Sequence, residues 1–180
     1  VLTEDFSDFI GDIDNDDLSL TVSGNVNVTV SISETIVTIG AVQDWNGTET
    51  LTFKVDDAQG RAVASDEVEI IVAPVNDTPI ANDVTLSTDE DIPVEIAMTG
   101  FDVDGDNLTF IVTSGPSNGS YDGTLYTPDE NYYGDDSFTF VVNDGSTNSE
   151  PATVSIIIRP VNDAPVLAEI GDQEMDEDTE

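Results

Sequence analysis

The sequence has no cysteine and no histidine, and each absence excludes whole classes of site. Without cysteine, neither disulfides nor thiolate metal sites can hold the fold together. Without histidine, the chain lacks the commonest general base, the usual zinc ligand and one member of the Ser-His-Asp triad. Zinc enzymes whose metal is held by histidine are therefore excluded, and so are hydrolases that use a Ser-His-Asp triad.

Basic residues are nearly as scarce. Lys54, Arg61 and Arg159 are the only strong bases among 180 residues, against 39 Asp and Glu, so the formal net charge is 3 − 39 = −36. A compact domain with this much charge of one sign repels itself unless salt, dispersal or bound cations relieve the repulsion. Nucleic acids and anionic membranes are poor partners for such a chain, because their phosphates need Lys and Arg. Divalent cations are good partners.

Long apolar runs are also missing, and none approaches the length of a bilayer-spanning helix. The apolar content of 38% is nevertheless organised in short alternating stretches, which argues against simple acidic disorder. Residue 1 is Val and no signal peptide is visible, so we expect the sequence to be a fragment of a longer protein.

An internal repeat is the strongest pattern in the chain. "VEIIVAPVND" at 68–77 reappears as "VSIIIRPVND" at 154–163, and "LTFKVDD" at 51–57 reappears as "FTFVVND" at 138–144. "TED" at 3–5 matches "DED" at 89–91, and "MDEDTE" at 175–180 restates "STDEDI" at 87–92. The pattern predicts a first, N-terminally truncated repeat over 1–79, a second over 80–165, and the start of a third over 166–180.

Within each repeat, apolar residues alternate with polar ones, as in Leu51, Phe53 and Val55. A period of two predicts strands with one face in a core and one in water. Turn pairs such as Asn46-Gly47 punctuate these strands, and no window shows a sustained helical period. We therefore expect an all-β protein made of sandwich domains, with the proline-bearing "PVNDxP" segments as stiff links between them.

Acidic clusters recur at matching places in the repeats. The pattern Asp-x-Asp-x-Asp occupies 12–16 and again 102–106, and an Asn-Asp pair lies in each linker, at 76–77 and 162–163. These side chains could simply be solvated turn residues, but their recurrence with few bases favours binding of Ca²⁺, which takes six to eight oxygen ligands. The spacing does not fit an EF-hand loop.

The stretch "FTFVVNDGSTNSEPATVSIIIRPVNDAP" at 138–165 resembles the end of a cadherin repeat, and "DVDGDNLTF" at 102–110 resembles the cadherin Asp-x-Asp loop. The whole chain is similar to the cadherin-like tandem repeats of large bacterial surface and secreted proteins. This resemblance implies tandem cadherin/Ig-like Greek-key β-sandwich domains in an extracellular protein.

The same resemblance implies Ca²⁺ between consecutive domains. One or two ions per junction are expected, because Pro74 and Pro160 stand where animal cadherins carry a further Asp. The implied ligands at the first junction are Glu4, Asn76, Asp77, Asp102, Asp104 and Asp144; those at the second are Glu90, Asn162 and Asp163; Asp12 and Asp14 belong to the matching loop of the first repeat.

The resulting hypothesis is a non-catalytic, calcium-rigidified spacer or adhesion region whose partners are calcium ions and neighbouring repeats. The alternative is a carbohydrate-binding or homophilic adhesive module, with polysaccharide or a like module on another cell as partner. Trp45, which aligns with Tyr132, could stack on a sugar in that case, although equivalent placement in both repeats favours a core-capping role.

The segment 166–180 repeats the beginning of the second repeat without the strands that would follow. Either this segment frays, or it completes the first repeat of another molecule by strand exchange.

Overall fold

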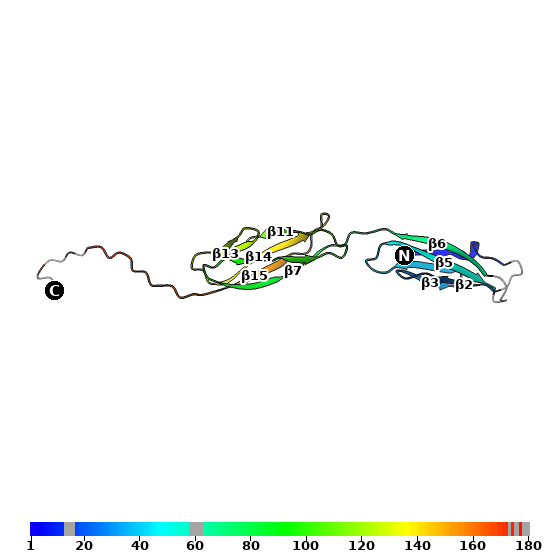
Figure 1. Ribbon diagram of the computed structural model, residues 1–180, viewed down its shortest axis with the longest axis horizontal. Coiled ribbons are helices and arrows are strands. Elements are labelled where there is room, and N and C mark those ends of the chain that lie inside the picture. The colour runs from blue at the N-terminus through cyan, green and yellow to red at the C-terminus, as the bar shows by residue number, and fades with distance from the viewer. Residues whose placement is uncertain (13–16, 58–62, 173, 175–176, 178–180) are drawn as a thin grey trace. The chain divides into compact units, whose positions relative to one another are not determined.

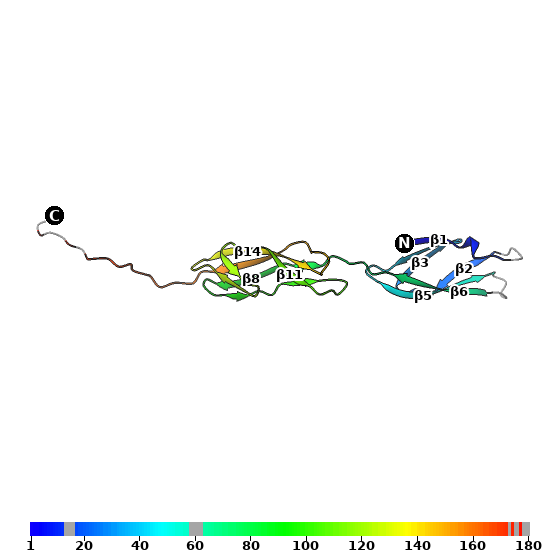
Figure 2. The ribbon, with the colours of Figure 1, turned by 90° about the horizontal axis from the view of Figure 1, so that it is seen from above.

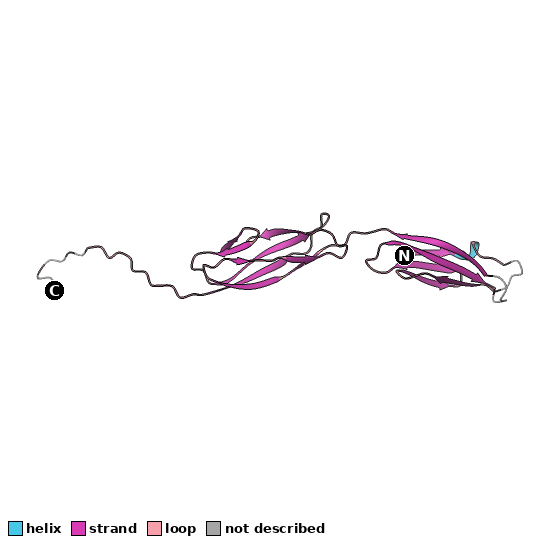
Figure 3. Ribbon diagram, viewed as in Figure 1, coloured by secondary structure: helices cyan, strands magenta, loops and turns pink. Residues whose placement is uncertain are grey.

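The computed structural model describes residues 1–12, 17–57, 63–172, 174 and 177. These residues form strands β1 to β15 and one short 3₁₀ helix, η1 (Phe6–Asp8), so the all-β prediction is confirmed (Figures 1 and 3). Two compact units are present: Val1–Thr78 with Asp102–Asp106, and Pro79–Phe101 with Asn107–Glu180.

The first unit contains two antiparallel sheets of three strands each. Their strand orders are β1 (Leu2–Asp5), β4 (Ile36–Ala41), β3 (Val28–Ser33), and β2 (Ser19–Ser23), β5 (Gly47–Asp56), β6 (Val63–Val72). Side chains from both sheets meet in one buried cluster, composed of Val28, Val37, Ile39, Leu51 and Phe53. A core shared by two sheets is the packing of a β-sandwich.

The second unit is built in the same way, with additional strands. Its largest sheet has the order β11 (Thr109–Ser114), β14 (Gly134–Asn143), β15 (Ala152–Arg159), β8 (Val84–Asp89). The other two sheets are β12 (Gly119–Tyr121), β13 (Leu125–Pro128), β9 (Val94–Glu95), and β10 (Thr99–Phe101), β7 (Ile80–Asn82). Figure 2 shows β8 and β14 from above.

The alternation of apolar and polar residues along the strands explains the core of the second unit. The inward residues Val154, Ile156 and Ile158 of β15 are at most 2% exposed, and Phe138 and Phe140 of β14 face the same cluster. Burial of each such side chain contributes about 1.5–3 kcal/mol. In β14 and β15, the period of two in the sequence therefore reports directly which face of the strand is inside.

Register shows which strands of the two units correspond. β1 pairs with β4, placing Leu2 opposite Ile39, and β9 pairs with β13, placing Val94 opposite Tyr126. The Val42 N–H donates to the Asn27 carbonyl as the Asp129 N–H donates to the Asn118 carbonyl, so Ile39 is the counterpart of Tyr126. Leu2 therefore corresponds to Val94, and the expected equivalence of "TED" at 3–5 with "DED" at 89–91 is not the one that strand pairing gives.

An aromatic residue two positions before a glycine caps each core. Gly47 and Gly134 have φ values of 142° and 134°, and a Cβ on either would lie within 3.1–3.2 Å of the ring of Trp45 or of the Tyr132 hydroxyl. Both aromatic side chains pack against their cores, which is the structural role that equivalent placement favoured. Tyr133 is instead 62% exposed.

A carboxylate two positions after that glycine holds a loop in each unit. Glu49 accepts hydrogen bonds from the backbone N–H groups of Val26 (2.6 Å), Asn27 (2.8 Å) and Val28 (3.3 Å). Burial alone would raise the pKa of Glu49, but these three donors, Asn27 foremost, hold it below its ordinary value. The bonds fix the chain where it enters β3.

Asp136 performs the same task in the second unit. Its carboxylate accepts from the N–H groups of Ser117 and Asn118, both at 3.0 Å, from the N–H of Ser137 at 2.9 Å, and from the buried Tyr126 hydroxyl at 2.7 Å. Burial would raise the pKa of Asp136, yet the Ser117 amide, the Tyr126 hydroxyl and the other donors lower it. The charged form is therefore the one that stabilises the fold.

We expect Asp136→Asn to lower the free energy of unfolding by about 1–3 kcal/mol, because buried N–H donors lose a charged acceptor. Since the pKa is depressed in the folded state, this contribution is present above the unfolded pKa of Asp and is lost as pH falls through the folded pKa. Urea unfolding at neutral pH and at acid pH measures both effects. Asp135→Asn, at an exposed neighbour, removes the same charge and is the control. Equal effects of the two variants at neutral pH would contradict the role assigned to Asp136.

Candidate metal centre

The loop between β10 and β11 folds around the carboxylate of Asp102. Asp102 Oδ1 accepts the N–H groups of Asp104 (2.9 Å) and Asp106 (3.4 Å), and the Gly105 N–H donates to the Asp102 carbonyl (3.3 Å). Gly105 has φ of 79°, a backbone conformation that glycine adopts without steric cost. The alternation of Asp with short residues is thus what turns the loop back on its first side chain.

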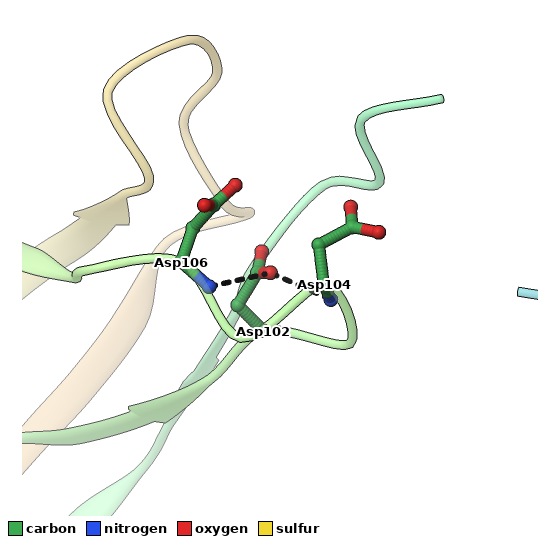
Figure 4. Close-up of side chains that lie close together, drawn as sticks. All are labelled: Asp102, Asp104 and Asp106. Atoms are coloured by element: carbon green, nitrogen blue, oxygen red, sulfur yellow. Dashed lines mark hydrogen bonds between the residues drawn. The ribbon is translucent and has the colours of Figure 1, made fainter. Parts of the chain in front are cut away.

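This folding brings three carboxylates together. Oxygens of Asp102, Asp104 and Asp106 lie within 4.8 Å of one another, with Asp102 between the other two (Figure 4). Over the described residues, this is the only group of three acidic side chains gathered so closely. Three negative charges at this separation repel one another unless a cation lies among them.

Asp102 carries a second, independent sign of a missing ligand. The side chain is only 6% exposed, and its Oδ2 is buried without a hydrogen-bond partner. A buried charged oxygen left unpaired is costly, and native structures satisfy nearly all such groups. The orphaned oxygen therefore fits a cation-binding loop better than a solvated turn.

A linker residue contacts the same loop. The N–H of Asp77 donates to Asp104 Oδ2 at 2.8 Å. Partial loss of water raises the pKa of the Asp77 carboxyl, and the negative charges of Asp44, Asp104 and Asp102 raise it further. Asp77 therefore experiences the charge of the cluster directly.

The linker residues adopt the same conformation in both repeats. Asn76 Nδ2 donates to the Asp77 carbonyl at 2.9 Å, and Asn162 Nδ2 donates to the Asp163 carbonyl at 3.1 Å. In each asparagine, Nδ2 makes this bond, so the side-chain oxygen Oδ1 takes no part in it. The duplicated sequence thus encodes a duplicated local conformation.

Glu90 lies against the second linker. It is 5% exposed, its carboxylate accepts the Val161 N–H, and its own N–H donates to the Arg159 carbonyl at 2.9 Å. The structure therefore brings Glu90 to the segment that holds Asn162 and Asp163, although these residues do not form a group of three close carboxylates.

The other predicted ligands lie in different settings. Asp144 closes its own turn, since Oδ1 accepts the N–H groups of Ser146 and Thr147, both at 2.6 Å. Glu4 is exposed on β1, Asp12 is half-buried, and Asp14 falls outside the described residues. Asp106, part of the Asp-x-Asp-x-Asp pattern, is absent from the ligand set that the resemblance implied, yet it is a full member of the cluster.

Residues 76–157 match the family model of the bacterial Ig domain. Among solved structures, human protocadherin-24 EC1-2 matches with a TM-score of 0.51 and 18% identity over 82% of this chain and 84% of that one. Both findings support an Ig-like, cadherin-like β-sandwich, and the second unit is such a domain.

Two further similarities involve much longer proteins. Integrin beta-like protein A of Dictyostelium discoideum is 33% identical over 116 residues, which are 53% of this chain and 6% of the relative. An endo-fucoidan hydrolase of glycoside hydrolase family 107 matches with a TM-score of 0.39 and 23% identity over 83% of this chain and 24% of that one. The chain thus spans a small part of either protein.

Across the described residues, no helix has the length and apolar character needed to cross a membrane.

We expect Asp102→Asn to raise the melting temperature in metal-free buffer. Asparagine keeps the Oδ1 acceptor for the two loop amides and removes an unpaired buried charge, which we expect to add about 1 kcal/mol to the free energy of unfolding. Thermal unfolding in chelator measures the change. Asp89→Asn, at an exposed position on β8, controls for net charge. A melting temperature below that of the unsubstituted chain would show that the Asp102 charge is already satisfied.

Proposed function

We propose that this chain is a calcium-binding region of tandem extracellular repeats, which serves a bacterial surface or secreted protein as a calcium-rigidified spacer or adhesion segment. The observation that carries the proposal is the buried, unpartnered Oδ2 of Asp102 within a cluster of three carboxylates.

The donor chemistry of the loop suits calcium. Ca²⁺ is a hard cation that takes carboxylate, amide and backbone oxygens in a flexible shell, and it tolerates six to eight of them. Asp102, Asp104 and Asp106 supply carboxylates, and we expect Asn76 and Asp77 to add oxygens, because the Asp77 N–H already donates to Asp104. Without histidine or cysteine, the chain lacks the imidazole and thiolate ligands that zinc prefers.

The negative net charge of the chain favours the binding of cations. A net charge of −36 makes each bound divalent cation a relief of self-repulsion. For an extracellular module, a Kd of about 10⁻⁴–10⁻³ M is typical. At about 10 mM calcium, a site of that affinity stabilises the folded state by about 1.4–2.7 kcal/mol.

The mechanical role follows from the linker contact. Asp77 belongs to the "PVNDTP" linker and donates to Asp104, so a cation bound by the Asp102–Asp106 loop would hold the linker to that loop. Prolines on both sides of Asp77 already restrict the linker backbone. Bound calcium would therefore add to the rigidity that the prolines already give the linker.

We infer no catalytic role for this chain. The Ig-like match over 76–157 and the cadherin-like fold support a non-enzymatic module, and the chain has no histidine to act as a general base. An extracellular location is consistent with calcium sites of millimolar affinity, because extracellular calcium is high enough to fill them.

Thermal unfolding tests the site. We expect millimolar calcium to raise the melting temperature of the unsubstituted chain and of Asp89→Asn, with a much smaller effect of magnesium, which demands a tighter octahedral shell. Asp102→Asn should lose most of the calcium response, so the variant that is more stable in chelator becomes the less stable one in calcium. An unchanged melting temperature with calcium, or an equal response in Asp102→Asn, would refute the proposed site.

The spacer role needs its own measurement. The absence of cysteine lets spin labels be placed at Thr50→Cys and Ser120→Cys, one in each unit and both exposed. We expect calcium to narrow the distribution of distances between the labels, and the Asp102→Asn background to abolish the narrowing. A distribution that stays broad while the melting temperature rises would separate calcium binding from rigidification and leave the spacer role unsupported.

A further inference from the structure

Strand β11 is an exposed edge of the second unit. It pairs with β14 on one side, and no strand pairs with its other side among the residues that the structure describes. Phe110, Ile111 and Val112 follow one another along β11 and are 36%, 43% and 40% exposed. Successive side chains of a strand point to opposite faces of the sheet, so both faces of this edge are apolar.

The corresponding strand of the first unit does not have this character. β2 pairs with β5 as β11 pairs with β14, so its Leu20, Thr21 and Val22 are the counterparts of the three apolar residues of β11. Leu20 and Val22 are half-buried against their core, and Thr21 makes the outer face polar. The apolar edge is therefore a property of the second unit and not a requirement of the fold.

A cavity of about 490 Å³ lies beside β11. Phe110 and Val112 line it from β11, and Met98 and Tyr121 contribute to its other walls. The Tyr121 ring is stacked on the buried Phe138, with ring centroids 4.8 Å apart, and this stacking holds its wall of the cavity in place. The inner face of the edge strand thus presents an exposed aromatic side chain next to a hollow.

The distribution of charge around β11 favours an antiparallel copy of the same strand as its partner. Natural edge strands commonly carry charges that prevent pairing with another chain, yet residues 107–121 contain no charged side chain in a sequence that is 23% charged. The acidic loop 102–106 precedes β11, and the uncharged segment 115–120 follows it. When two copies pair antiparallel, the acidic loop of each lies beside the uncharged segment of the other. A parallel copy would bring the two acidic loops together, where they repel.

We propose that β11 is a homophilic interface, at which two copies of this chain pair their β11 strands antiparallel about a twofold axis. An axis through Ile111 sets Ile111 opposite Ile111 of the second copy and Phe110 opposite Val112, since directly opposite residues share a face of the sheet. Each Phe110 then lies beside the cavity that Val112 lines in the other copy. The irregularity in the register of β11 falls between Val112 and Ser114, so it does not interrupt these pairs. The interface uses the same surface on both copies, and it therefore closes as a dimer.

Size and net charge set the strength of this association. One pair of short strands makes an interface at the low end of the sizes that bind specifically. Each copy has a net charge of −36, so the copies repel at long range, and salt screens this repulsion with a Debye length of about 10 Å at 0.1 M. We therefore expect a weak dimer that strengthens as NaCl rises. Weak contacts of this kind become strong when many tandem repeats engage together.

Sedimentation of the full chain in chelator tests the interface independently of the calcium site. We expect a dimer fraction that grows with protein concentration and with NaCl. Ile111→Asp and Ile111→Lys each set like charges opposite each other on the twofold axis, and each should weaken dimerisation by about tenfold. An equimolar mixture of the two variants sets opposite charges there and should restore dimers. Such recovery also shows that both variants are folded.

Ile157→Asp is the matched control. Ile157 lies on β15, a central strand of the same sheet, and is 48% exposed against 43% for Ile111. The control should dimerise like the unsubstituted chain. A chain that stays monomeric at about 1 mM protein in about 0.5 M NaCl would overturn the proposal, and so would Ile111 variants that dimerise as well as the control.

Disulfide formation tests the register. The chain has no cysteine, so Ile111→Cys places a single thiol on the proposed axis. Directly opposite Cβ atoms of an antiparallel pair lie about 4.5–5.5 Å apart, a separation that a disulfide can bridge with a small adjustment. We expect Ile111→Cys to form a disulfide-linked dimer under mild oxidation, and Ile157→Cys to form far less. Equal yields from the two variants would rule out the proposed pairing.

Discussion

Hydrogen bonds from backbone N–H groups to carboxylates are the interaction on which this structure depends. With three strong bases for 39 acidic residues, most carboxylates cannot be neutralised by ion pairs. Backbone amides supply positive dipoles without adding charge, and bonds to an ionised acceptor are about twice as strong as neutral ones. Glu49, Asp136 and Asp102 each fix a loop in this way, and the loops in turn set where strands begin.

The same interaction distinguishes structural carboxylates from candidate ligands. Asp136 is saturated, since four donors share its two oxygens and one of them is a buried hydroxyl. Asp102 is half-satisfied, because its Oδ1 closes the loop while its Oδ2 is buried with no donor. A carboxylate whose two oxygens both accept hydrogen bonds is a part of the scaffold. An unsatisfied oxygen beside two further carboxylates makes a place where a cation lowers the free energy.

The sequence predicted the strands well, because burial on one face imposes a period of two, as β14 and β15 show. It also predicted that Asp102 and Asp104 act together, since they lie two residues apart in one short loop. The equivalence of Glu4 with Glu90 failed because a three-letter match carries little information, whereas the register against Ile39 and Tyr126 is decided by core packing.

The loop-holding roles of Glu49 and Asp136 could not have been predicted from the sequence. Asp135 and Asp136 are adjacent and chemically identical, and only the pleat of β14 turns one toward the loop and the other toward water. The first unit uses glutamate at the same place, so residue identity gives no common motif. Such a role depends on a loop that is remote in sequence, and it is visible only when the loop and strand lie together.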